Sequence, residues 1–277
     1  MLSSMLERVR GTSPLVHCIT NYVTVNDCAN ILLACGASPI MADDLREAAE
    51  ITSLCAGLDI NIGTLNERTI PSMFNAGRRA AELGHPVLLD PVGAGASGLR
   101  TDTARGLLAE IPFAAVRGNA SEIKTLAVGS GATQGVDAAA ADALGEDTIA
   151  SAVAMARGFA RQTGAVVIIT GAVDLVTNAD DTLLIRNGHP MMARITGSGC
   201  MLSAMMTAYL AANPDQPLEA AAAAVCAMGI CGEQAAERVQ AQRSGNASLR
   251  TYLIDAICNL DGETLEKGAK LEPYAGL

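Results

Sequence analysis

Short apolar runs alternate with longer stretches of helical periodicity along most of this chain. The runs cover residues 15–20, 38–41, 58–62, 87–90, 114–117 and 166–170. The helical stretches between them cover residues 25–35, 45–56, 66–83, 101–110, 121–127 and 149–162. Strands that alternate with helices pair in parallel through crossover connections. Near-continuous apolar strands indicate helices on both faces of the sheet. The sequence therefore predicts an α/β fold with a mostly parallel central sheet, in a single domain over residues 1–277.

The pattern changes in the last third of the chain. Residues 174–177, 183–186 and 191–195 predict hairpin-type strands, and residues 201–211, 218–240 and 249–260 predict helices. Residues 220–231 are apolar nearly all round, which implies burial on several sides. Packing against another subunit and a central position in one domain both explain that burial. The Gly-, Ala- and Asp-rich residues 129–145 predict a surface excursion.

The charge balance narrows the possible partners. The formal net charge is −10, and the chain has only three Phe and four Tyr. Nucleic-acid binding relies on Lys and Arg at phosphates and often on aromatic stacking, so we expect no nucleic-acid partner. Only 17% of the residues are charged, which indicates much buried surface or an oligomer. An acidic protein that binds an anion needs a local device, such as a helix N-terminus, an Arg or a divalent cation.

The cysteine spacing and the length of the apolar stretches indicate the cellular compartment of the protein. Eight cysteines occur without a C-x-x-C pair, so zinc-ligand spacing is missing. Residues 1–12 lack the apolar core of a secretory signal, and no stretch reaches the roughly 20 apolar residues of a membrane helix. We therefore expect a reducing, cytoplasmic location and no membrane partner.

Ligands of parallel α/β sheets bind beyond the carboxyl ends of the strands. The residues that follow the predicted strands are Asn21, Met41, Gly63, Asp90, the segment 117–119, Thr170 with Gly171, and the segment 196–200. The carboxyl edge of the predicted sheet thus gathers an acid, an arginine, hydroxyls and a glycine turn. Met41 is an apolar wall of a pocket or simply part of the core.

The turn Thr196-Gly197-Ser198-Gly199-Cys200 lies between a predicted strand and a predicted helix. Two glycines let the backbone approach a ligand, and the helix N-terminus offers unpaired N–H groups. Together they predict an anion hole suited to a phosphoryl group, although a tight connection without a ligand is the alternative. No G-K-[ST] occurs and Leu202 replaces the third glycine, so the turn is neither a P-loop nor a dinucleotide fingerprint.

Three charged residues have a functional and a structural interpretation each. Asp90 suits Mg²⁺, directly or through water, or it caps a turn. Glu122 points at the site while Ser121 caps the helix, or it is a first-turn acid favoured by the helix dipole. Arg117 suits phosphate binding, or it forms a surface salt bridge.

Several motifs in this order resemble the hydroxyethylthiazole kinase family of the ribokinase-like superfamily. They are PLVHCITNYVTVNDCAN (14–30), GASPIMA (36–42), NIGTL (61–65), LLDPVGAGAS (88–97), RGNASEI (117–123), the pair Thr170-Gly171 and TGSGCMLSA (196–204). The resemblance implies a three-layer ribokinase-like fold. It also implies that ATP phosphorylates the hydroxyl of 5-(2-hydroxyethyl)-4-methylthiazole in thiamine salvage, with Mg²⁺, in a homotrimer whose active sites lie between subunits.

The family's roles carry over residue by residue. The resemblance implies thiazole contacts from Asn21, Met41, Gly63 and Gly197, and ATP contacts from Arg117, Asn119 and Thr170. It implies that Asp90 and Glu122 organise the metal. Cys200 stands where related sugar kinases usually have an Asp that takes the proton of the alcohol. We expect Cys200 to orient the hydroxyl or to act as a weak base; the alternative is a small buried residue at a helix start.

Other functions remain open on the sequence alone. A kinase of the same fold for a pyrimidine or pyridoxal alcohol is the nearest one, although Cys200 and residues 17–30 speak against it. A nucleotide-dependent repair dehydratase of similar fold and a non-enzymatic binder of thiamine precursors are the others. Release of ADP that depends on the thiazole alcohol distinguishes the thiazole kinase from all of these.

Overall fold

A nine-stranded sheet forms the centre of the computed structural model, which describes residues 1–128 and 146–275. The strand order is β2-β1-β3-β4-β5-β6-β7-β8-β9. The strands from β2 to β6 are parallel, and β7, β8 and β9 are antiparallel. The strands are β1 Leu15–Ile19, β2 Ser38–Ile40, β3 Gly57–Asn61, β4 Val87–Asp90, β5 Ala115–Asn119, β6 Val166–Thr170, β7 Asp174–Thr177, β8 Thr182–Ile185 and β9 Leu271–Pro273.

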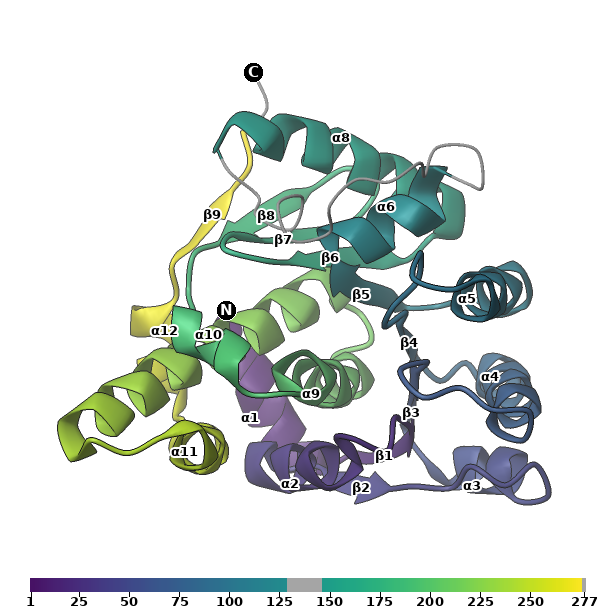
Figure 1. The fold of residues 1–277 in the computed structure, drawn as a ribbon, viewed down its shortest axis with the longest axis horizontal. Helices are drawn as coiled ribbons and strands as arrows, with labels where there is room; N and C mark the ends of the chain where they lie inside the picture. The colour runs from purple at the N-terminus through teal and green to yellow at the C-terminus, as the bar shows by residue number, and fades with distance from the viewer. Residues whose placement is uncertain (129–145, 276–277) are drawn as a thin grey trace.

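Helices cover both faces of this sheet, as Figure 1 shows. One face packs against α2 Val25–Cys35, α9 Ser198–Ala212 and α10 Pro217–Gln242. On these helices pack α1 Leu2–Thr12, α11 Asn246–Asn259 and α12 Gly262–Gly268. The other face packs against α3 Ala48–Leu54, α4 Thr69–Leu83, α5 Gly98–Glu110, α6 Ala120–Val128 and α8 Glu146–Thr163. The predicted α/β class, with a mostly parallel sheet between two helical layers, is therefore confirmed.

Local signals explain both ends of α4. The side chain of Asn66 accepts hydrogen bonds from the backbone N–H groups of Arg68 and Thr69, and so caps the entry to α4. Gly84 ends α4 with a φ of 69°, a left-handed conformation that favours glycine. The helix predicted from Asn66 thus begins three residues later, at Thr69, and ends where expected.

The predicted strand over residues 191–195 is wrong. This segment contains a 3₁₀ helix, Pro190–Arg194, and His189 caps it by accepting a hydrogen bond from the N–H of Met191. Pro190 has no N–H to give to a ladder. The edge of β8 is instead occupied by β9, which comes from the C-terminal end of the chain. Residues 129–145, the predicted excursion, lie outside the described part of the chain.

Helix α10 owes its burial to this chain alone. Its residues from Ala220 to Gly232 are buried, and α1, α9, α11 and the strands β6 to β8 surround it. The central position is thus the correct explanation of its apolar surface, and the helix needs no second subunit to cover it. No helix in the described part of the chain is both long and apolar enough for a membrane span.

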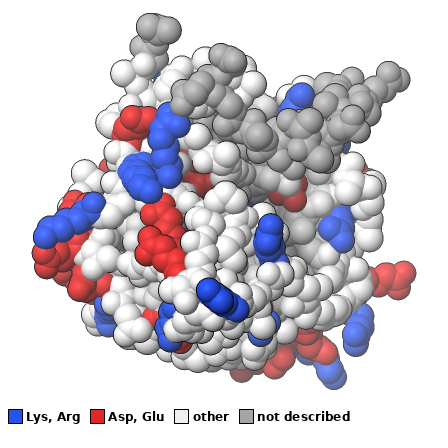
Figure 2. Space-filling model, turned by 60° about the vertical axis from the view of Figure 1, so that its left-hand side comes forward, with Lys and Arg blue, Asp and Glu red and all other residues white. Residues whose placement is uncertain are grey.

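Charged side chains are sparse on the face of the molecule that Figure 2 shows. On the face in Figure 2, basic and acidic side chains lie interspersed, with wide uncharged areas between them. All eight cysteines are free thiols, and only Cys258 is exposed.

Candidate active site

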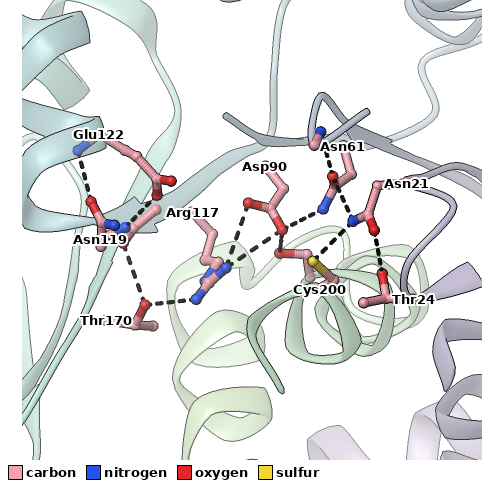
Figure 3. Close-up of polar contacts among 12 residues, drawn as sticks. Asn21, Thr24, Asn61, Asp90, Arg117, Asn119, Glu122, Thr170 and Cys200 are labelled. Carbon is pink, nitrogen blue, oxygen red and sulfur yellow. Dashed lines mark hydrogen bonds and ion pairs between the residues drawn. The ribbon is translucent and has the colours of Figure 1, made fainter. Parts of the chain in front are cut away.

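The carboxyl ends of the parallel strands bring most of the predicted site residues together (Figure 3). Asn21 follows β1, Gly63 follows β3, and Asp90 and Asn119 end β4 and β5. Thr170 ends β6, and Cys200 lies in the first turn of α9. Met41 follows the edge strand β2, is half-buried, and packs against the apolar cluster that contains Cys200.

The glycine turn is a helix N-terminus, as predicted. Gly197 is the residue before α9 and has a φ of 85°, and a Cβ there would collide with the side chain of Thr24. Gly199 has a different role, since a Cβ on it would lie 2.5 Å from both terminal nitrogens of Arg117. The first N–H groups of any helix lack partners within the helix. The guanidinium of Arg117 therefore lies directly against an end of α9 that can receive an anion.

Arg117 is not part of a surface salt bridge, because its side chain is only 12% exposed. Its Nη2 donates to Oγ1 of Thr170 at 2.7 Å, and its Nη1 lies 3.5 Å from both carboxylate oxygens of Asp90. Its buried Nε has no partner among the described residues. An arginine that is fixed in place beside a helix N-terminus suits an incoming phosphate.

Asp90 is fully buried, and its carboxylate is held by side chains. Oδ2 accepts from Nδ2 of Asn61 at 2.8 Å and from Oγ of Ser203 at 2.9 Å. Burial raises the pKa of Asp90 to about 6, although the nearby Arg117 opposes that rise. Among the described residues its carboxylate receives no backbone N–H, so the role of a turn cap does not apply.

Glu122 and Asn119 form a reciprocal capping box at the start of α6. Oδ1 of Asn119 accepts from the N–H of Glu122, and Oε2 of Glu122 accepts from the N–H of Asn119, both at 2.8 Å. The helix thus begins one residue before Ser121, and the predicted Ser121 cap is wrong. Oε1 of Glu122 also accepts from the N–H of Gly93 at 2.7 Å. Glu122 therefore fixes the loop that follows Asp90.

Cys200 lies at the other end of the cluster, in contact with two asparagines. Nδ2 of Asn21 donates to Sγ of Cys200 at 3.2 Å and to Oδ1 of Asn61 at 3.1 Å. Burial, and then the charge of Asp90, raise the pKa of the Cys200 thiol. The sulfur is therefore a neutral thiol at neutral pH, which can orient a hydroxyl but is a poor base.

The sequence analysis missed several residues of this cluster. Asn61 links the Cys200 side to Asp90, and it was readable as a polar residue at a strand end. Ser203 could be identified from the sequence only as the residue one turn after Cys200 on the same helix face.

Asp59, also missed, lies two residues before Asn61 on the same face of β3 and is fully buried. Both of its carboxyl oxygens lack partners among the described residues. Burial, and then the charge of Asp90, raise the pKa of Asp59 well above its usual range, so both favour the protonated carboxyl.

A cavity of about 540 Å³ adjoins Arg117. Its walls come from the end of β6, the first turn of α9, the middle of α10 and the segment around His189. Asp174 lies in its wall, and burial raises the pKa of that carboxyl to about 7. A larger hollow of about 700 Å³ lies between the C-terminal ends of α5, α6 and α8, away from the strand ends. The cavity beside Arg117 is thus the one that joins the polar cluster.

The donor set fits a Mg²⁺ ion that keeps most of its water. No group of three or more His, Cys, Asp or Glu side chains in the described residues could cage a metal. Mg²⁺ is usually bound through one or two carboxylates together with substrate phosphates and water. Oδ1 of Asp90 has only the weak 3.5 Å contact with Arg117, so it has capacity left for a ligand of that kind.

Comparisons with known proteins show which family this chain resembles. The model of the "HK: Hydroxyethylthiazole kinase family" matches residues 6–263. A hydroxyethylthiazole kinase of Clostridium acetobutylicum is 60% identical over 99% of this chain and 100% of its own length. One from Desulfovibrio desulfuricans is 50% identical over 96% of this chain and 95% of its own.

Solved structures extend the comparison to three dimensions. A hydroxyethylthiazole kinase protein of Pyrococcus horikoshii superposes with a TM-score of 0.86 at 36% identity, covering 98% of each chain. An ADP complex of Bacillus subtilis pyridoxal kinase has a TM-score of 0.57 at 17% identity, covers 78% of this chain and 90% of its own, and shares the fold only. With a family match over most of its length and close relatives over nearly all of it, the chain belongs to the hydroxyethylthiazole kinase family.

Proposed function

We propose that this protein is a kinase that transfers the γ-phosphoryl group of ATP to the hydroxyl of 5-(2-hydroxyethyl)-4-methylthiazole, as a step of thiamine salvage. The observation that supports it most is the position of Arg117. It lies between the N-terminus of α9, Asp90 and a 540 Å³ cavity, with Cys200 on the opposite side of Asp90. A phosphoryl donor and an alcohol acceptor can therefore meet across one buried carboxylate.

ATP binds in the cavity beside Arg117. Its base and ribose enter the space beside Thr170 and His189, and its phosphates reach Arg117 and the first N–H groups of α9. Thr170 holds the guanidinium of Arg117 in place, and Asn119 fixes the loop at the end of β5. Oriented donors of this kind stabilise the charge that builds up during phosphoryl transfer.

The thiazole alcohol binds across Asp90 from ATP, next to Cys200. Asn21, Gly63 and Gly197 surround that end of the cluster, and Met41 provides an apolar wall. The hydroxyl oxygen forms a bond to the γ-phosphorus, the bond from that phosphorus to the bridging oxygen of ADP breaks, and the hydroxyl proton is released. The neutral thiol of Cys200 orients the hydroxyl, and a loose transition state requires little from a base.

Mg²⁺ is the expected metal, and Asp90 and Glu122 are the residues that would hold it. When bound there, the ion would neutralise charge on the transferring phosphates. Asp90 is kept in position by Asn61 and Ser203, so its carboxylate cannot rotate away from the phosphates. Glu122, whose oxygens already accept two backbone N–H groups, acts mainly by fixing the loops after β4 and β5.

We further propose a homotrimer with active sites between subunits, a single catalytic domain and a cytoplasmic location, in line with the family. Light scattering on the purified protein tests the assembly. A monomer at micromolar concentration would contradict the trimer.

A coupled assay of ADP release tests the reaction itself. We expect ADP to appear only when the thiazole alcohol and Mg²⁺ are both present. Pyridoxal and a hydroxymethylpyrimidine serve as competing acceptors in the same assay. Faster turnover with either of them, or ADP release without the thiazole, would overturn the proposed substrate.

A further inference from the structure

Arg100 occupies an electrostatically unfavourable place in the first turn of α5. Ser97 caps this helix by accepting a hydrogen bond from the N–H of Arg100, so Arg100 is the third residue of the helix. The N-terminal end of a helix carries partial positive charge and disfavours a cation. An arginine at this position therefore needs strong acceptors elsewhere.

Two backbone carbonyls provide those acceptors, and they belong to different strand-end loops. Nη2 of Arg100 donates to the carbonyl of Gly63, after β3, at 2.7 Å. Nη1 donates to the carbonyl of Val92, after β4, at 3.1 Å. One half-buried guanidinium thus bridges a loop on the thiazole side and a loop on the metal side.

Gly93 makes room for this bridge. It has a φ of 76°, and a Cβ on it would collide with Nη1 of Arg100. The N–H of Gly93 donates to Oε1 of Glu122, which also accepts from the N–H of Asn119 through its other oxygen. A continuous series of hydrogen bonds therefore runs from Gly63 through Arg100 and Glu122 to the end of β5.

We propose that Arg100 is a positioning residue that holds the loop after β3 and the loop after β4 at a fixed separation, and so aligns the acceptor hydroxyl with the phosphoryl group. The proposal rests on the proposed function for the identity of the two ligands. The bridge itself is a property of the ligand-free protein. Each loop keeps its own side-chain contacts without Arg100, through Asn61 for Gly63 and through Glu122 for Gly93. Loss of Arg100 therefore affects alignment more than binding.

Two variants and one matched control test this role. Arg100→Met keeps the length of the side chain without its donors, and Arg100→Lys keeps the charge without the two-pronged geometry. Arg105 is the control, because it lies on the same helix and donates to the backbone carbonyl of Thr125 in α6, instead of to a carbonyl of the two bridged loops. Arg105→Met thus removes a similar hydrogen bond without touching the bridge.

Steady-state kinetics gives the first measurement. A displacement of about 1 Å between reacting groups can reduce turnover about 100-fold. We expect kcat of Arg100→Met to fall about 10- to 100-fold, while the KM values for ATP and the thiazole each change less than about threefold. Arg100→Lys should recover part of kcat, and Arg105→Met should match the wild type. A kcat of Arg100→Met within about twofold of wild type would overturn the proposal.

Hydrogen exchange without ligands gives the second measurement, independent of any substrate. Backbone N–H groups in residues 61–66 and 92–97 should exchange about tenfold faster in Arg100→Met, because the variant loses both hydrogen bonds that tie the two loops together. Equal acceleration in Arg105→Met, or none in Arg100→Met, would refute the bridge. If the wild type shows no thiazole-dependent ADP release, the proposed function fails, while the exchange result still decides whether the bridge exists.

Discussion

Substitution of Gly199 by alanine tests the central contact of the site. The added Cβ would lie 2.5 Å from Nη1 and Nη2 of Arg117 and 2.8 Å from its Cζ. Non-bonded carbon and nitrogen atoms approach to about 3.5 Å, so the guanidinium must retreat by about 1 Å. The helix itself should tolerate the change, because alanine is favoured over glycine in a helix by about 1 kcal/mol.

The retreat of Arg117 has a calculable consequence. Its hydrogen bond to Thr170 is 2.7 Å long and would be lost or stretched, together with its 3.5 Å contact with Asp90. A hydrogen bond from a charged group contributes about 1.5–3 kcal/mol, and about 1.4 kcal/mol corresponds to a factor of ten. We therefore expect kcat/KM for ATP to fall about 10- to 100-fold without loss of thermal stability.

The pH profile provides a second readout of the same change. Arg117 lowers the pKa of Asp90 from what burial alone would give, and that pKa is about 6. With the guanidinium displaced the pKa of Asp90 rises, so the acid limb of kcat/KM should move to higher pH.

Gly158→Ala is the matched control for these measurements. Gly158 is an exposed glycine of α8 with nothing within 4 Å of its would-be Cβ, so the substitution should only raise the melting temperature. Wild-type kcat/KM for ATP in Gly199→Ala, with an unmoved acid limb, would refute the role assigned to Arg117.

Two further substitutions test the interior of the cluster. Cys200→Asp should stay active or become faster, because a carboxylate at this position could accept the proton of the hydroxyl, and Cys200→Ala should turn over more slowly. Steady-state kinetics with the thiazole alcohol decides this, and an inactive Asp variant or an Ala variant with full kcat would count against an orienting thiol. Asp59→Asn should change how stability depends on pH, because the folded protein holds a proton on Asp59 that the unfolded chain releases above its pKa of about 3.9. Wild type thus loses stability relative to the variant as pH rises from about 4 through the raised pKa, by about 1.4 kcal/mol per pH unit, as urea unfolding at several pH values would show. A difference between the two proteins that stays constant with pH would mean that Asp59 is ionised in the folded state.

The sequence alone determined the layers of the fold and the edge at which the site lies. Short apolar runs and helical periods record which faces are buried, and that information is local. Parallel strands end at one edge, so Asn21, Asp90, Arg117 and Thr170 could be expected there before any contact was known. Helix α1 was readable in the same way, since Leu2, Met5, Leu6 and Val9 recur at helical spacing, but the sequence analysis did not assign it.

Only the tertiary structure decided which side chains touch. Asn21 and Cys200 are 179 residues apart and Ser203 and Asp90 are 113 apart, so their contacts depend on strand order and on the position of α9. The same holds for β9, which takes the edge of β8 that residues 191–195 were expected to use. Periodicity gives the direction of a side chain relative to its own element, whereas the packing of the elements determines the partner that it meets.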